Sequence, residues 1–238
     1  MSRLTLLSAG AAAMLAGCGV VRADSAGPAA TRSFAASGFD RVELRGSDNV
    51  VVRVGAAESV TATGPEKELE RLKVEVVDGA LRVGREGKWS MGWATGREPV
   101  VITVTVPKLR GASVAGSGDM KVDRVQTPSF NGAIAGSGNL EIGMLQSDAA
   151  SIKIAGSGDA AISGETKSLE ISIAGSGNLA APGLKAEHAK IKIAGSGDVR
   201  AYVSGDADVS IVGSGDVELA GNPRCRVSKM GAGDVRCG

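Results

Sequence analysis

The chain has 238 residues and carries 27 Lys and Arg against 26 Asp and Glu, so its net charge of +1 does not indicate a nucleic-acid partner. Its 35 glycines contrast with only two Trp, one Tyr and three Phe. This composition argues against a large globular core and favours a thin core of small and branched side chains.

The first residues form an export signal. A positively charged start is followed by an apolar run over residues 4–16, which is too short to span a membrane as a helix of the mature protein. The run ends in Leu-Ala-Gly-Cys at residues 15–18, which resembles the lipobox of bacterial lipoproteins. The resemblance implies a signal peptide over residues 1–17, a lipidated Cys18 and, because Gly19 is not Asp, sorting to the outer membrane of a Gram-negative cell. The alternative is an ordinary secretory signal cut after Ala23.

A flexible tether is expected over residues 18–37, which are small, polar and Pro-containing and show no apolar periodicity. The rest of the chain, residues 38–238, is predicted to be one all-β unit. We divide it into an irregular part at 38–110 and a regular repeat at 111–238.

The irregular part is predicted to contain strands, one short helix and one hairpin. Pro65 followed by two glutamates predicts a helix over residues 65–72, and Asp78 and Gly79 between apolar runs predict a hairpin turn. Residues 46–49 look like a degenerate form of the corner that recurs later in the chain. The predicted strands are 41–44, 50–54, 60–63, 74–77, 81–83 and 100–106.

Two tryptophans, Trp89 and Trp93, fall in a Gly-bearing segment at 88–96. Exposed indoles would offer an aromatic platform for a sugar or a protein, whereas buried indoles would cap the end of a core. We favour capping and keep Trp89 and Trp93 as candidate binding residues.

The strongest signal is an internal repeat. A Gly-Ser-Gly sequence begins at residues 116, 136, 156, 175, 195 and 213, and Gly-Ala-Gly follows at 231. The spacing is 18 to 20 residues throughout, and a period of this length indicates a solenoid or array.

Apolar and polar residues alternate on both sides of each Gly-Ser-Gly, which is typical of strands with one buried face. We therefore predict a parallel β-solenoid with 18–20 residues per coil, each coil made of two strands and two corners. A meander of β-hairpins is the alternative topology. In the solenoid, four isoleucines form one interior column while Lys192 is exposed; they are Ile154, Ile173, Ile193 and Ile211.

An Asp or Asn follows every Gly-x-Gly, so stacked coils would align these residues in a ladder. The carboxylates could hold a cation, as in calcium-binding β-rolls, or the side chains could accept hydrogen bonds from corner amides, which we favour. Alternating Asp with Asn keeps like charges from lying on neighbouring strands. The ladder residues are Asp119, Asn139, Asp159, Asn178, Asp198, Asp216 and Asp234.

Cys225 and Cys237 are the cysteines that remain after Cys18. In an exported protein they are expected to pair as a disulfide, because a zinc site would need further ligands and the single histidine, His188, is distant in sequence. In the same copy, Lys229 replaces the apolar residue of the earlier repeats, as expected of a terminal repeat.

The repeat, together with a Phe-Asp-Arg-Val sequence at 39–42, Gly-Pro at 64–65 and Val-Pro at 106–107, resembles the head GIN domain family of putative autotransporter adhesins. The resemblance covers residue 39 to the C-terminus. It implies a right-handed β-helix of pectin-lyase-like appearance in which Gly-Ser-Gly makes the tight turns, and a family without recognised catalytic residues, for which adhesion was suggested from structural analogy.

We expect a non-catalytic envelope protein with an adhesive or structural role and without a metal, a cofactor or catalytic residues. The alternative is a carbohydrate-active enzyme of the pectin-lyase-like type, which needs acidic and basic residues in a cleft built by long loops, and the repeats contain no such insertion. A left-handed acyltransferase would need a hexapeptide repeat and a catalytic histidine, whereas His188 is expected to be a surface residue. The expected partners are a membrane and a glycan or protein ligand; self-association stays open.

Overall fold

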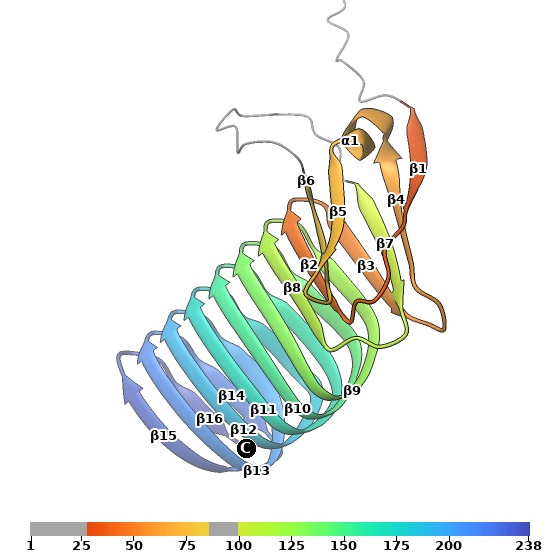
Figure 1. The fold of residues 1–238 in the computed structure, drawn as a ribbon. Helices are drawn as coiled ribbons and strands as arrows, with labels where there is room; N and C mark the ends of the chain where they lie inside the picture. The colour runs from red at the N-terminus through yellow and green to blue at the C-terminus, as the bar shows by residue number, and fades with distance from the viewer. Residues whose placement is uncertain (1–27, 86–99) are drawn as a thin grey trace, which may run out of the picture.

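A stack of β-coils dominates the computed structural model, which describes residues 28–85 and 100–238 (Figure 1). Successive coils pair in parallel and in register, with Ile154 beside Ile173, for example, and Gly156 beside Gly175. The predicted β-solenoid is therefore confirmed, and the hairpin meander is excluded for the repeats. In the described residues, no helix is long and apolar enough to cross a membrane.

The regular coils share one design. A strand runs into the first corner, which is the Gly-Ser-Gly corner, and continues along the opposite face. Two pairs of adjacent outward-facing residues, such as 123–124 and 128–129, then mark two bends, so each coil has one bend more than predicted. We call these two bends and the short segment between them the second corner, which leads into the next coil. The long strands pass through this second corner without a break, so each contributes to both faces of the stack. The strands are β8 (Gly111–Gly116), β9 (Met120–Gly136), β10 (Leu140–Gly156), β11 (Ala160–Gly175), β12 (Leu179–Gly195), β13 (Val199–Gly213), β14 (Val217–Ala220), β15 (Arg224–Met230) and β16 (Val235–Cys237).

The first corner requires glycine because the coils touch there through their backbones. Gly136 has a φ of +128°, and a Cβ added to it would lie 2.4 Å from the carbonyl oxygen of Gly116 in the preceding coil. The same oxygen accepts hydrogen bonds from the N–H groups of Ser137 and Gly138, at 2.9 and 3.0 Å. A side chain at this position would push two coils apart and break these bonds.

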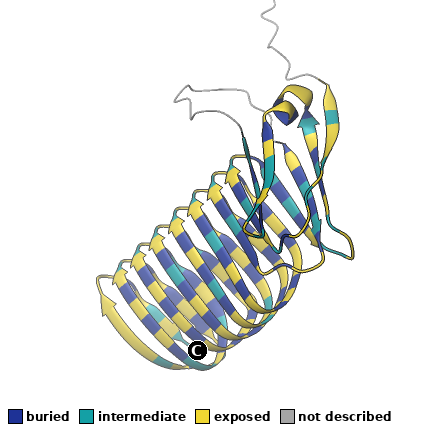
Figure 2. Cartoon of the chain, in the orientation of Figure 1, coloured by how far each residue is buried: buried dark blue, intermediate teal, exposed yellow. Residues whose placement is uncertain are grey.

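The core is a set of columns that run along the stack (Figure 2). Ile154, Ile173, Ile193 and Ile211 lie in register and none is more than 2% exposed, whereas Lys192 is exposed. The predicted interior column is confirmed. The same alternation holds along β9 to β13, because each residue meets its equivalent in the next coil, whereas β15 in the last coil is mostly exposed.

The irregular part begins with one further coil and then departs from chain order. β2 (Arg41–Gly46) and β3 (Asn49–Val54) stack on β8 and β9, with Gly46 beside Gly116, so residues 46–49 do form a first corner. The chain then leaves the stack and returns on the outer side of this coil. There β6 (Ala80–Arg85) pairs in parallel with β2, and β7 (Val101–Val106) pairs in parallel with β3.

Antiparallel strands cover this N-terminal end of the stack. β5 (Leu72–Val77) forms the predicted hairpin with β6, and β4 (Ser59–Pro65) pairs with β7. The helix α1 (Glu66–Glu70) follows Pro65, as predicted, and ends slightly earlier than expected. No β-solenoid pattern in the sequence distinguished these covering strands from the strands of a coil.

One boundary differs from the sequence-based prediction. Within the expected tether at 18–37, β1 (Ala29–Phe34) is a strand that pairs antiparallel with β4, from Ala29 beside Pro65 to Phe34 beside Val60. The segment lacks apolar periodicity because most of its side chains are exposed, and its strand conformation comes from pairing with the free edge of β4. An edge of this kind accepts a strand of almost any composition.

Candidate functional site

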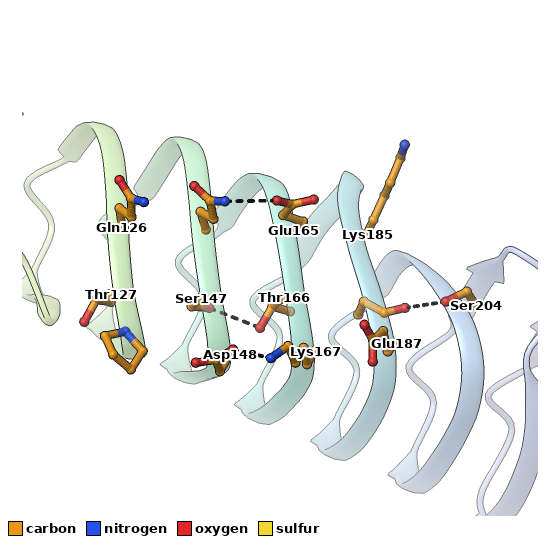
Figure 3. Close-up of a pocket in the computed structure, with 13 residues that line it drawn as sticks. Gln126, Thr127, Ser147, Asp148, Glu165, Thr166, Lys167, Lys185, Glu187 and Ser204 are labelled. Atoms are coloured by element: carbon orange, nitrogen blue, oxygen red, sulfur yellow. Dashed lines mark hydrogen bonds and ion pairs between the residues drawn. The ribbon is translucent and has the colours of Figure 1, made fainter.

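A groove runs along the stack at the second corner, parallel to the solenoid axis (Figure 3). Its volume is about 540 Å³, and it crosses the strands β9 to β13. We call it the second-corner groove. It is lined by Gln126, Thr127, Pro128, Gln146, Ser147, Asp148, Glu165, Thr166, Lys167, Lys185, Ala186, Glu187 and Ser204.

The floor of the groove consists of small residues in register. Thr127 and Thr166 are nearly buried, and each donates its hydroxyl to the carbonyl oxygen two residues ahead, at 3.2 Å. This local hydrogen bond satisfies the backbone where the strand bends. The Ser147 hydroxyl lies 3.1 Å from that of Thr166, so hydroxyl groups continue from one coil to the next.

One wall carries amides and charges from successive coils. Gln126, Gln146, Glu165 and Lys185 occupy equivalent exposed positions, one in each coil. The Gln146 amide donates to the Glu165 carboxylate at 3.2 Å. Because neighbouring coils are about 4.8 Å apart, this wall presents a polar group at each such step along the axis.

The opposite wall contains Asp148, Lys167 and Glu187 (Figure 3), and Pro128 also lines the groove. The Lys167 ammonium lies 2.7 Å from the Asp148 carboxylate. The hydrogen bond and the negative charge of Asp148, with a smaller contribution from Glu187, raise the pKa of Lys167. The proximity of Asp148 therefore favours the charged form of Lys167 in this wall of the groove.

The Asp/Asn ladder lies at the first corner, outside this groove. Each Oδ1 accepts the backbone N–H of the next ladder residue, as from Asn139 to Asp119 at 3.0 Å and from Asp216 to Asp198 at 2.8 Å. Asn139 and Asn178 also donate their side-chain amides to the carboxylate of the preceding coil, at 2.8 and 2.9 Å. The ladder thus connects coils through hydrogen bonds. In residues 28–85 and 100–238, no group of three or more His, Cys, Asp or Glu residues is placed to hold a metal ion.

The ladder begins one coil earlier than the repeat pattern indicated. Asn49 accepts the N–H of Asp119 at 3.3 Å and so is its first member. The alignment of Gly46 with Gly116 would have revealed this from the sequence, because Asn49 then coincides with Asp119.

Beside it, Asp48 stands where the regular corners have their second glycine. It is 1% exposed and accepts hydrogen bonds from Nε of Arg85, at 2.8 Å, and from the N–H of Val100, at 3.1 Å. Arg85 also binds Glu68 of α1. This buried group joins the first coil to both β6 and the start of β7. Sequence reasoning missed it, because no local pattern links residues 48, 68 and 85.

The other predicted site residues are dispersed. Cys225 and Cys237 form a disulfide in the last coil, and His188 is an exposed residue of β12 whose Nδ1 lies 3.7 Å from Asp206. Cys18, Trp89 and Trp93 lie outside the described residues. Among the residues that the structure describes, neither the cysteines of the disulfide nor His188 lies in the second-corner groove.

The groove itself was not identified from the sequence. Its walls consist of outward-facing residues that lie away from the Gly-Ser-Gly sequence and its inward-facing columns. A signal was present, because Gln126, Gln146, Glu165 and Lys185 recur with the period of the repeat.

Comparisons with known proteins agree on the fold. The profile of a family described as "Putative auto-transporter adhesin, head GIN domain" matches residues 38–223. A search of curated proteins finds no match.

Several solved structures share the fold. A putative adhesin from Bacteroides fragilis superposes with a TM-score of 0.75 at 22% identity, over 87% of this chain and 96% of that one. A putative lipid binding protein from Parabacteroides distasonis gives 0.68 at 24% identity, over 88% of this chain and 96% of that one. A putative adhesin from Parabacteroides merdae gives 0.67 at 17% identity, over 88% and 95%.

Proposed function

Because the chain belongs to the family of putative auto-transporter adhesins that share the head GIN domain, we propose that it is a non-catalytic adhesion protein of the cell envelope. In this proposal a lipid on Cys18 anchors it to the outer membrane, and the second-corner groove binds the ligand. The adhesin names of its structural relatives support the class of function, and the groove supplies a surface for it.

The lining of the groove fits a glycan strand. Sugar hydroxyls donate and accept hydrogen bonds, and the walls and floor of the groove carry amides, carboxylates, hydroxyls and the ammonium groups of Lys167 and Lys185. The polar groups recur about every 4.8 Å along a straight axis, which suits an extended polymer more than a compact small molecule. The observation that carries the proposal is this continuous polar groove across several coils.

A matched pair of substitutions in one strand tests the groove. Glu165 and Glu170 are both exposed residues of β11, but only Glu165 lines the groove. On a glycan array, we expect Glu165→Ala to weaken binding about tenfold, since a hydrogen bond to a charged group contributes about 1.5–3 kcal/mol. Glu170→Ala should bind as the unchanged chain does.

Equal effects of the two substitutions would place binding outside the groove. Shortened glycan products after incubation would contradict the non-catalytic assignment and would favour the carbohydrate-active enzyme instead. Binding to a protein with none to any glycan on the array would overturn the ligand class while leaving the adhesion role in place.

A further inference from the structure

The two ends of the stack differ in how their edges are covered. At the N-terminal end, β5, β4 and β1 cover the coil edges. At the other end, β15 pairs with β13, and in residues 28–85 and 100–238 no strand pairs with its outer side. The outward N–H and C=O groups of β15 therefore form an open edge that can accept another strand.

Outward-facing charges alternate in sign along the stack. In one row Glu170, Lys190, Asp208 and Arg226 lie in register, and Arg226 binds Asp208 at 3.4 Å. Interior members of such a row thus have an opposite charge on both sides. Arg226 belongs to the last coil and has one on its inner side only.

Two parallel rows end in the same way. His188, Asp206 and Arg224 form one, with Asp206 lying 2.9 Å from Arg224. Arg200, Glu218 and Arg236 form the other, with 3.5 Å between the first two. All three rows therefore end in an arginine at the open end, and the next strand in the pattern would carry carboxylates.

We propose that β15 is a docking strand for an extended segment of another polypeptide in which acidic and apolar residues alternate. The acidic residues would pair with Arg224 and Arg226, whose side chains are 83% and 81% exposed. Next to Arg226, Val227 points inward, in register with buried Val209, yet is 47% exposed because no described strand covers it. An apolar side chain of the partner would extend the core over Val227.

A second copy of this chain fits the edge less well. β15 has three cationic residues, Arg224, Arg226 and Lys229, and no acidic residue. Pairing two copies of it would bring like charges together, which destabilises a strand pair. Cationic residues on an edge commonly prevent such self-pairing. The same charges attract an acidic strand.

A peptide with the sequence of one segment of this chain can test binding to β15. β15 already pairs on its inner side with Asp206–Val212, in which acidic and apolar residues alternate. A labelled peptide of this sequence with a neutral polar tail is titrated against the full chain, and its fluorescence anisotropy is followed. We expect saturable binding that is about tenfold weaker when both aspartates of the peptide are replaced by asparagine, because two cross-strand charge pairs are lost.

Substitutions in the chain give the complementary test. The double variant Arg224→Ser with Arg226→Ser should lose binding about as much as the asparagine peptide does, whereas Lys153→Ser, at an exposed position of β10, should leave it unchanged. Amide exchange should slow in β15 when the peptide is bound and stay constant in β10. The asparagine peptide keeps the proposal testable if the double variant loosens the last coil.

Equal affinity for the two peptides would overturn the proposal, as would protection that appears away from β15. Concentration-dependent dimerisation of the chain that the double variant abolishes would replace the acidic partner by a second copy. These readouts do not involve the second-corner groove, so they are independent of the proposed glycan binding.

Discussion

At the scale of single residues, the phase of each strand decides which side chains contribute to stability. Ile193 and Lys192 are neighbours in β12, but the first lies in the interior column and the second faces solvent. We expect Ile193→Ala to lower the free energy of unfolding by about 2–5 kcal/mol, through lost burial and a cavity between two coils. Lys192→Ala should change it by no more than about 0.5 kcal/mol.

Denaturant unfolding of the full chain, followed by circular dichroism, measures both values. Equal effects of the two substitutions would contradict the phase assigned to β12. Since an Ile lies next to its equivalent in each adjoining coil, Ile173→Ala should repeat the result of Ile193→Ala.

The ladder residues show a second effect at this scale. Asn139 and Asn178 each place a donor between carboxylates of the coils beside them. Alternating Asp with Asn therefore separates the negative charges of the ladder. The Asn side chain also donates a hydrogen bond, which an Asp carboxylate at the same position could not do. Asp198, Asp216 and Asp234 lack this amide and connect only through backbone N–H groups.

At the scale of elements, the last coil depends on its disulfide. Cys225 is aligned with buried Ala207 and Cys237 with buried Leu219, so the bond joins the two faces at the end of the core. Lys229 is aligned with Ile211 and instead donates to the carbonyl oxygen of Gly233 at 2.9 Å. The interior column therefore has no apolar residue at this end, and we expect the disulfide to stabilise the coil instead.

We expect reduction of this disulfide to loosen the end of the stack first. Closing a loop of this length contributes about 3 kcal/mol in the chain-entropy model, and in a stacked array that effect stays near the closed coil. Hydrogen exchange after reduction should rise in residues 217–238, while residues 152–173 remain protected.

Non-reducing peptide mapping of protein isolated from cells provides the control for the bond itself. Free thiols on both Cys225 and Cys237 would contradict the pairing. A uniform loss of protection along the whole chain would contradict a local capping role.

At the scale of the whole molecule, the direction of the stack determines which end of the protein a lipid anchor on Cys18 would hold near the membrane. β1, the first described strand, lies at the covered N-terminal end, and β15 lies at the far end (Figure 1). A chain held at Cys18 would therefore have its covered end nearer the membrane. The second-corner groove and the open edge of β15 would then be accessible to ligands and partners.

Lipidation is testable on the intact protein. We expect mass spectrometry of the membrane fraction to find the mature N-terminus at Cys18 with acyl groups attached, and Cys18→Ser to release the protein from that fraction because an anchored chain needs its acyl groups to remain bound. A soluble form beginning at Asp24 would instead support an ordinary secretory signal.

The sequence by itself determined the solenoid, its period and the phase of its strands. Every regular coil repeats the same local pattern, so Gly136 and Ile193 could be assigned without knowing the tertiary structure. The turn at Asp78 and Gly79 was equally local, because both adopt positive φ values that few residues accept. Family membership followed from these same repeated residues.

The tertiary structure decided which distant segments became neighbours. The strands β6 and β7 stack outside the first coil, and β1 joins β4, because free strand edges select partners by backbone hydrogen bonding and not by a sequence pattern. The second-corner groove likewise exists only once registered coils bring Gln146 beside Glu165. The buried contact of Asp48 with Arg85 required the same long-range placement, which local periodicity does not encode.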